Sequence, residues 1–219
     1  MTQQVEAVRS SGRPASERKL RARGRRTSAR LLDAGLRVFS ERGYHAARVD
    51  DIVERAATSH GTFYLYFSNK EDLLQALARE CAGEMQRLAD ELGDVTPDAA
   101  GHAELRAWVE GFYLTYTRYG AVIRVWMEEQ LPDPELARMG TEAFRRLAST
   151  LGERMTAGRA TGDEPGDEPG RVRVRADLAP VLLLAMVERF TYFAASRGRP
   201  ADEDRLLDDL TLLVQRGFF

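Results

Sequence analysis

Apolar residues recur at helical spacing along most of this chain. They return every three or four positions from Leu31 to Phe39, again from Leu73 onward, and in several later segments. This pattern predicts an all-α fold. The predicted helices span residues 27–42, 49–56, 60–66, 68–92, 101–119, 121–129, 135–158, 177–197 and 201–217. Gly43 and Gly120 are the predicted stops of two of them.

The stretch from Val49 to Tyr66 predicts two short helices separated by the break Ala57-Thr58-Ser59. Ser59 is a favourable N-cap for the second helix, because its hydroxyl can accept an orphan backbone N–H. Phe63 and Phe67 lie four residues apart and can anchor one face of that helix. The pattern is typical of a helix-turn-helix.

The other face of the second short helix carries His60, Thr62 and Tyr64. An imidazole, a hydroxyl with a methyl group and a phenol can contact base edges and phosphates. DNA binding is one interpretation of this face. A helical hairpin in a protein core, with a few exposed aromatic residues, is the alternative.

Basic residues gather before the first predicted helix. Residues 1–26 lack apolar periodicity and predict a disordered arm, which ends in Arg25 and Arg26 just before Thr27, the predicted cap. Such an arm beside a helix-turn-helix can follow phosphates or enter a minor groove. A solubilising tail is the alternative.

A capping box of Ser68 with Glu71 predicts the start of a long helix that ends near Leu92. Lys70 falls in its first turn, where a cation opposes the helix dipole unless an anion lies nearby. A DNA phosphate would supply that anion, whereas a solvated lysine would make the conflict small.

Several stretches together resemble the N-terminal DNA-binding domain of the TetR family of transcriptional regulators. The resemblance rests on Thr27 to Tyr44, on Val49-Asp-Asp-Ile52, on Gly61-Thr-Phe-Tyr-Leu-Tyr-Phe67 and on Asn69-Lys-Glu-Asp-Leu-Leu74. It covers about residues 25–75, and the C-terminal domain is not matched by motif. It implies a homodimeric repressor that binds a palindromic operator and releases it when a small molecule occupies the C-terminal domain.

The resemblance also implies roles for single residues. Base reading falls on His60, Thr62 and Leu65, and contacts to the DNA backbone fall on Tyr64, Tyr66 and Lys70. Arg48 stands where the family commonly has Thr or Ser. The full set of predicted DNA-binding residues is Arg25, Arg26, Thr27, Arg48, His60, Thr62, Tyr64, Leu65, Tyr66 and Lys70.

Charge is distributed unevenly along the chain. Residues 1–70 hold 14 Lys/Arg against 7 Asp/Glu, whereas residues 71–219 hold 18 against 27. A basic head on an acidic body indicates that the head alone meets a polyanion. There is no membrane-spanning run or secretion signal, and one cysteine, Cys81, cannot form an internal disulfide; a cytoplasmic location is expected.

The C-terminal part is rich in aromatic residues and methionine, which we interpret as a pocket for a small apolar or aromatic effector. Any one of these residues is more often simply core. The pocket candidates are Trp108, Phe112, Tyr113, Tyr116, Arg124, Trp126, Met127 and Met155.

The last two predicted helices carry more apolar surface than a terminal hairpin can hide, which indicates a homodimer interface. The candidates are Leu182, Met186, Phe190, Leu206, Leu210 and Leu213. Before them, residues 159–175 predict a mobile acidic loop that contains Asp-Glu-Pro-Gly twice. A metal there is not expected, since prolines recur and histidine is absent.

The predicted organisation is therefore a basic arm (1–26), a helix-turn-helix domain (27–75) and a ligand-binding and dimerisation domain (76–219). An all-helical enzyme is a second hypothesis, but there is no metal motif, phosphate loop or nucleophile elbow, and Glu188 beside Arg189 is more readily a salt-bridged pair. A protein-interaction module without DNA affinity is a third. No cofactor and no membrane contact are expected; the partners are double-stranded DNA, an effector and a second copy of the chain.

Overall fold

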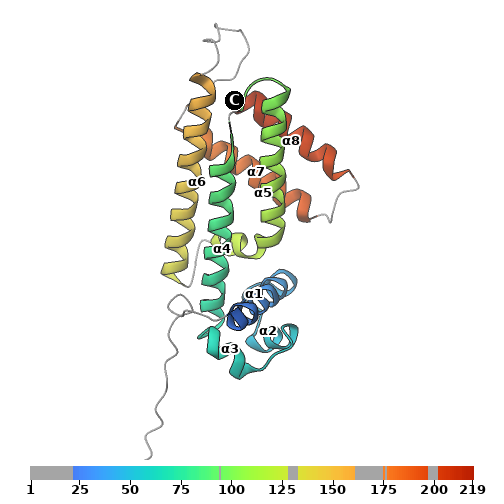
Figure 1. The fold of residues 1–219 in the computed structure, drawn as a ribbon, viewed down its shortest axis with the longest axis vertical. Coiled ribbons are helices and arrows are strands. Elements are labelled where there is room, and N and C mark those ends of the chain that lie inside the picture. Colours follow the sequence, from blue (N-terminus) through green and yellow to red (C-terminus); the bar gives the residue numbers. More distant parts are fainter. Residues whose placement is uncertain (1–21, 94, 128–132, 161–174, 176, 197–201) are drawn as a thin grey trace, which may run out of the picture. The chain divides into compact units, whose positions relative to one another are not determined.

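The computed structural model describes residues 22–93, 95–127, 133–160, 175, 177–196 and 202–219, and these residues form eight α-helices (Figure 1). The helices are α1 (Ala22–Arg42), α2 (Val49–Arg55), α3 (His60–Tyr66), α4 (Lys70–Glu91), α5 (Ala99–Trp126), α6 (Pro134–Ala160), α7 (Ala179–Ser196) and α8 (Glu203–Phe218). The prediction of an all-α fold is confirmed. The chain divides into two compact units, Met1–Ala78 and Arg79–Phe219.

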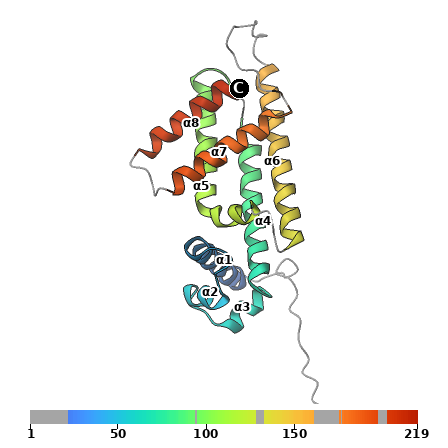
Figure 2. The same cartoon turned by 180° about the vertical axis from the view of Figure 1, so that it is seen from behind.

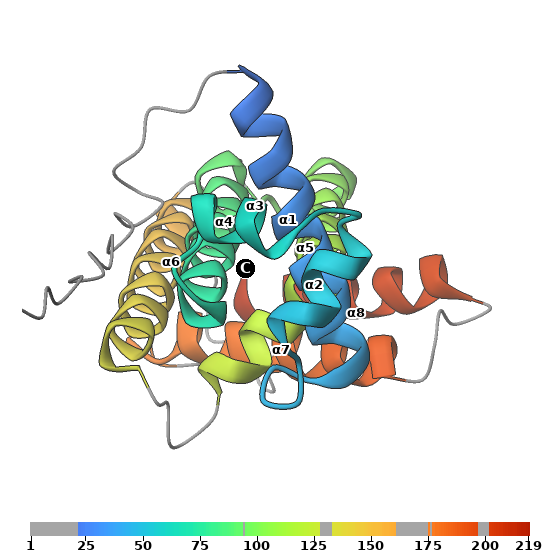
Figure 3. The same cartoon turned by 90° about the horizontal axis from the view of Figure 1, so that it is seen from below.

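In the N-terminal unit, α2 packs against α1 and α3 (Figure 3). The helix α2 ends in a Schellman motif, in which the Thr58 N–H donates to the Val53 carbonyl and the Ala57 N–H donates to the Glu54 carbonyl. This motif places Ala57 at φ +46°, a left-handed conformation that an alanine adopts at some cost. The turn is thus tight, and α3 begins three residues after it.

Two boundaries differ most from the sequence prediction. The helix α1 begins at Ala22 and not at Thr27, so Arg25 and Arg26 lie on a helix and not on a flexible arm. Residues 1–21 of the predicted arm, and most of the predicted acidic loop, lie outside the described residues. Gly120 does not end a helix, because α5 continues to Trp126. The apolar positions Val122 and Val125 extend the buried stripe beyond Gly120, and their burial outweighs the roughly 1 kcal/mol that a helical glycine costs.

In the C-terminal unit, α5 packs against α8 and α7, and α7 also packs against α6 (Figure 2). Gln215 of α8 is buried and joins α8 to the start of α5. Its amide nitrogen donates to the Thr96 carbonyl at 2.7 Å, and its amide oxygen lies 3.2 Å from Nδ1 of His102. Because that amide oxygen can only accept, Nδ1 of His102 carries the proton in this arrangement.

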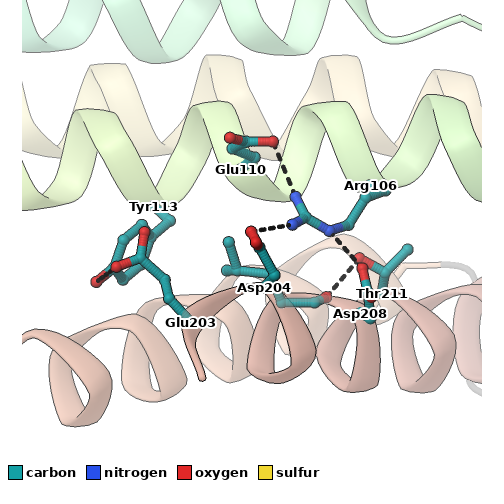
Figure 4. Close-up of polar contacts among 8 residues, drawn as sticks. Arg106, Glu110, Tyr113, Glu203, Asp204, Asp208 and Thr211 are labelled. Atoms are coloured by element: carbon teal, nitrogen blue, oxygen red, sulfur yellow. Dashed lines mark hydrogen bonds and ion pairs between the residues drawn. The ribbon is translucent and has the colours of Figure 1, made fainter. Parts of the chain in front are cut away.

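A charged cluster makes a second link between α5 and α8 (Figure 4). The Arg106 guanidinium donates to Asp208 at 2.7 Å, to Glu110 at 2.9 Å and to Asp204 at 3.4 Å. Its side chain is 17% exposed, whereas its three acceptors are mostly exposed. The guanidinium donors therefore remain satisfied while the arginine stem packs between the helices.

Candidate functional site

The helix α3 is fixed by one face and presents the other. Its N-cap is Ser59, whose hydroxyl accepts the Thr62 N–H at 3.2 Å, as the sequence predicts. Phe63 and Phe67 are 0% and 1% exposed, and their ring centroids lie 5.8 Å apart. The prediction that they anchor one face is confirmed.

The opposite face of α3 is open to solvent. Tyr64 is 52% exposed and Leu65 is 63% exposed, one helical turn after His60 and Gly61, which are exposed as well. Thr62 and Tyr66 lie half-buried at the rim of this face. Large exposed apolar side chains on a fixed helix indicate a surface for a partner. We call His60, Thr62, Tyr64, Leu65 and Tyr66 the α3 face.

The start of α2 is capped by Asp51 and not by the side chain of Arg48. Arg48 is the extended N-cap residue, and an arginine side chain has no acceptor for the first backbone N–H groups. Asp51 makes the contact instead, since its carboxylate accepts the Arg48 N–H at 2.9 Å and also bonds to Arg42 of α1 at 2.7 Å. Arg48 itself is exposed.

The cap of α4 lies one residue later than the predicted Ser68–Glu71 box. Asn69 accepts the Asp72 N–H at 2.7 Å, and the Asp72 carboxylate accepts the Ser68 N–H at 2.9 Å. The Glu71 carboxylate does not cap α4 and instead accepts a hydrogen bond from the Tyr44 hydroxyl at 3.2 Å.

Lys70 also has a different environment from the predicted one. Its ammonium donates to the backbone carbonyls of Tyr44 at 2.9 Å, Ala47 at 3.0 Å and His45 at 3.4 Å. It also lies over the Tyr44 ring, 4.5 Å from the centroid. Carbonyls of the connector between α1 and α2 offset the unfavourable position of this cation in the first turn of α4. The contact of Lys70 with a DNA phosphate stays a prediction.

The remaining predicted DNA contacts lie on α1. Arg25 and Arg26 are exposed and Thr27 is half-buried. Their contact with DNA stays a prediction.

Three of the predicted pocket residues lie together on α5. Trp108, Phe112 and Tyr116 form a column on α5, with ring centroids 5.7 and 6.4 Å apart, and the Tyr116 hydroxyl donates to Glu188 of α7 at 3.0 Å. Burial, followed by the charge of Glu188, raises the pKa of Tyr116, so its hydroxyl stays protonated. Glu188 also lies 3.8 Å from Arg189, as expected from the sequence.

The other pocket candidates differ in their contacts and in their exposure. The Tyr113 hydroxyl reaches Glu203 of α8 at 3.4 Å (Figure 4), and the ring of Trp126 lies against Gly140 of α6. Met155 is buried on α6. Met127 is 63% exposed within the described residues and Arg124 is also exposed, and their place in a pocket stays a prediction.

Three buried polar groups have no hydrogen-bond partner within the described residues: the indole nitrogens of Trp108 and Trp126 and the Thr191 hydroxyl. Thr191 is 1% exposed and lies on α7, one turn after Glu188. Buried polar groups are normally paired, so these donors mark places that an acceptor can occupy. Sequence periodicity identifies the aromatic column but gives no sign of Thr191.

An apolar surface follows α7 and α8. Its most exposed members are Leu182 at 47%, Phe193 at 51% and Leu213 at 63%. Met186, Phe190 and Leu206 are half-buried. Leu210 is only 2% exposed within its own chain and belongs to the core. The prediction that Leu210 is an interface residue is therefore wrong. We call Val181, Leu182, Tyr192, Phe193, Leu212 and Leu213 the α7–α8 face.

The described residues give little support for metal binding, thiol chemistry or a membrane-spanning helix. Among them no group of three or more His, Cys, Asp and Glu side chains could hold a metal ion. Burial raises the pKa of the Cys81 thiol to about 12, which leaves it protonated and unreactive near neutral pH. None of the helices in the described ranges has both the length and the apolar character that crossing a bilayer requires.

The fold and the α3 face agree with comparisons to known proteins. Residues 31–77, which include α2, α3 and the start of α4, match the model of bacterial regulatory proteins of the TetR family. Residues 31–77 are therefore a DNA-binding domain of the TetR type. The relatives of this chain are transcription regulators and not enzymes.

Two curated TetR relatives extend the match beyond the helix-turn-helix. The transcriptional repressor AcnR of Corynebacterium diphtheriae is 29% identical over 182 residues, 81% of this chain and 86% of the relative. The fatty acid metabolism regulator protein of Bacillus subtilis is 29% identical over 134 residues, 61% of this chain and 68% of the relative. Among solved structures, the regulator FadR from Bacillus subtilis in complex with stearoyl-CoA is similar with a TM-score of 0.62 and 20% identity, over 87% of this chain and 99% of that chain. The structural likeness shows a common fold.

The position of Lys70 predicts a structural effect of its loss. Lys70→Met keeps the apolar stem but leaves the carbonyls of Tyr44 and Ala47 without their donor, and we expect it to destabilise the N-terminal unit by about 2 kcal/mol. Hydrogen exchange of the amides of residues 43–49, measured on the full chain, should become faster. Arg30→Met removes an exposed cation from α1 and serves as the control. Unchanged exchange in Lys70→Met, with weaker DNA binding, would show that Lys70 acts as a phosphate contact and not as a support of the connector.

Proposed function

We propose that this chain is a homodimeric repressor that binds a palindromic operator through the α3 face and releases it when a small apolar or aromatic effector binds the C-terminal unit. The observation that carries the DNA-binding part is the α3 face itself. A short helix held by two buried phenylalanines presents exposed aromatic, apolar and imidazole groups. Recognition helices of helix-turn-helix proteins read bases in the major groove from such a face.

The second part of the proposal is the homodimer. The α7–α8 face exposes several large apolar side chains on two helices that pack together, and water contact with such side chains is unfavourable. Pairing with the same face of a second copy would bury it in a four-helix arrangement. A twofold dimer reads two half-sites about 34–36 Å apart, which is one turn of DNA, so operator binding depends on the spacing of the two α3 helices.

The third part concerns the effector. The column of Trp108, Phe112 and Tyr116 is apolar along its rings, yet Trp108 and Thr191 bring unpaired donors to the interior. An apolar molecule that carries acceptor oxygens would satisfy both features. The complex of the similar FadR with stearoyl-CoA supports this class, since an acyl thioester combines an apolar chain with a carbonyl acceptor.

The release mechanism follows from differential binding. An effector shifts the operator equilibrium only if it binds more tightly to the dimer whose α3 spacing does not fit the operator. The helix α4 is continuous from Lys70 to Glu91 and thus carries residues of both units. We therefore assign the transmission of the signal to α4.

DNA reading is tested first with variants of the α3 face. Tyr64→Ala should weaken binding to all duplexes by roughly tenfold, because a contact with the DNA backbone is independent of sequence. Thr62→Val removes the hydroxyl and should change the preferred base at one position of each half-site. The measurement is selection from random duplexes followed by titration in a gel-shift assay. If both variants keep the wild-type profile and affinity, the assignment of the α3 face is wrong.

Dimer formation is tested by placing charge on the α7–α8 face. Leu213→Glu should convert the dimer to monomers and reduce operator affinity by at least about 100-fold, since each half-site then binds alone. Sedimentation equilibrium and gel shift report the two effects. Leu114→Glu, at a residue that is 55% exposed on α5, is the matched control and should leave the dimer intact. A dimer that survives Leu213→Glu argues for another interface.

Effector binding is tested at Thr191, where two effects of opposite sign are expected. Thr191→Val removes a buried hydroxyl without a partner and should stabilise the ligand-free chain by about 1 kcal/mol. The same change should reduce the rise in melting temperature that stearoyl-CoA produces, because the donor is lost. Thr117→Val, at an exposed residue of α5, should change neither. An unchanged response to stearoyl-CoA in Thr191→Val would exclude Thr191 from the effector site.

A further inference from the structure

One contact on the α3 side of the helix-turn-helix has no evident structural purpose. Nε2 of His60, in the first turn of α3, lies 2.6 Å from a carboxylate oxygen of Asp50, in the first turn of α2. Both side chains are largely exposed, 55% for His60 and 74% for Asp50. Exposed pairs of this kind contribute little to folding, and they restrict two side chains that would otherwise be free.

The neighbouring residue Asp51 makes the side-chain contacts that hold the start of α2. Asp51 already accepts the Arg48 N–H and bonds to Arg42 of α1, so it both caps α2 and joins it to α1. The two adjacent carboxylates therefore have different partners, since Asp50 bonds to His60 of α3. A carboxylate so close to a DNA-reading surface also repels phosphates, which makes its presence there unfavourable for binding unless it serves recognition.

We propose that Asp50 is a positioning residue for base recognition, which holds the His60 imidazole through Nε2 so that the bases are read by the rest of that ring. This inference rests on the proposed role of the α3 face in reading DNA. Fixing a side chain before binding avoids the loss of its rotamer freedom on the DNA and narrows the set of bases that it can contact.

The hydrogen bond also determines which ring nitrogen is available. Nε2 is occupied by the carboxylate, so Nδ1 is the ring nitrogen that remains for DNA. In the neutral ring with its proton on Nε2, Nδ1 is an acceptor, and it suits the amino groups of adenine or cytosine in the major groove. In the charged ring, Nδ1 is a donor and suits O6 or N7 of guanine. The base selected at this position therefore reports the charge of the ring.

The experiment compares base-preference profiles of the full chain. The wild type, Asp50→Ala, His60→Ala and the double variant are each selected on random duplexes, and their affinities for every single-base variant of the selected half-site are then titrated. Asp50→Ala and His60→Ala should lose discrimination at the same base pair, by about tenfold, and the double variant should lose no more than either one. Asp50→Asn keeps an acceptor oxygen and should restore the profile while it binds all duplexes more tightly.

Matched variants separate this role from general effects of charge and folding. Asp33→Ala removes an exposed carboxylate that pairs with Arg37 on α1, and it should leave the profile unchanged. Thermal melting is followed for every variant, and if Asp50→Ala melts well below the wild type, Asp50→Ser replaces it in the same comparison.

Several outcomes would overturn the inference. If Asp50→Ala tightens binding to all duplexes without a change of profile, Asp50 is only a repelling charge. If Asp50→Ala changes a base position that His60→Ala leaves intact, Asp50 reads DNA itself. A wild-type chain that selects no duplex sequence would remove the proposed function and, with it, this role of Asp50.

Discussion

The arrangement of the N-terminal unit depends on the contact between the Lys70 ammonium and the connector between α1 and α2. A connector of irregular backbone leaves carbonyls that need donors, and Lys70 supplies them from the first turn of α4. Tyr44 is held on both sides, by Lys70 over its ring and by Glu71 at its hydroxyl. Because α2 starts directly after this connector and α3 follows α2 through a tight turn, the position of the α3 face depends on this contact.

In the described part of the C-terminal unit, some buried polar groups are paired and others are not. Where α5 packs against α8, the polar groups are satisfied. Arg106 of α5 bonds to three carboxylates, and Gln215 of α8 is bonded at both ends of its amide. Elsewhere, the buried donors of Trp108 and Thr191 have no partner in the part of the chain that the structure describes. A satisfied polar network resists rearrangement, whereas unpaired donors favour binding of whatever supplies acceptors. This contrast is why we place the effector near the aromatic column and α7 and not near α8.

The sequence predicts the parts of this structure that local chemistry decides. The bounds of α3, its Ser59 cap and the burial of Phe63 and Phe67 all follow from residues within eight positions of one another. The helical class of every described element also follows from periodicity. The helix-turn-helix and its family could be identified because these local signals occur in a fixed order.

Other features depend on partners that are distant in the sequence or on packing. The carbonyls bonded to Lys70 lie 23 to 26 residues before it, so its environment could not be read from its place in the first turn of α4. The helix α5 continues through Gly120 because the residues beyond it are buried. Leu210 lies in the core because it packs against other residues of its own chain. Periodicity shows that a residue is on an apolar face, but it does not show which neighbour covers that face.

In the helix-turn-helix, the contacts that stabilise the fold differ from the contacts on the face that we propose to read DNA. The Schellman motif after α2, the Ser59 cap and the buried phenylalanines fix α3 without any use of its exposed face. Contacts on that face, such as the one between His60 and Asp50, are exposed and therefore weak in water. Residues of the α3 face can thus change with little effect on stability, which would allow one scaffold to take different operators. A contact that adds little to stability, yet joins two helices beside the reading surface, is best explained by recognition.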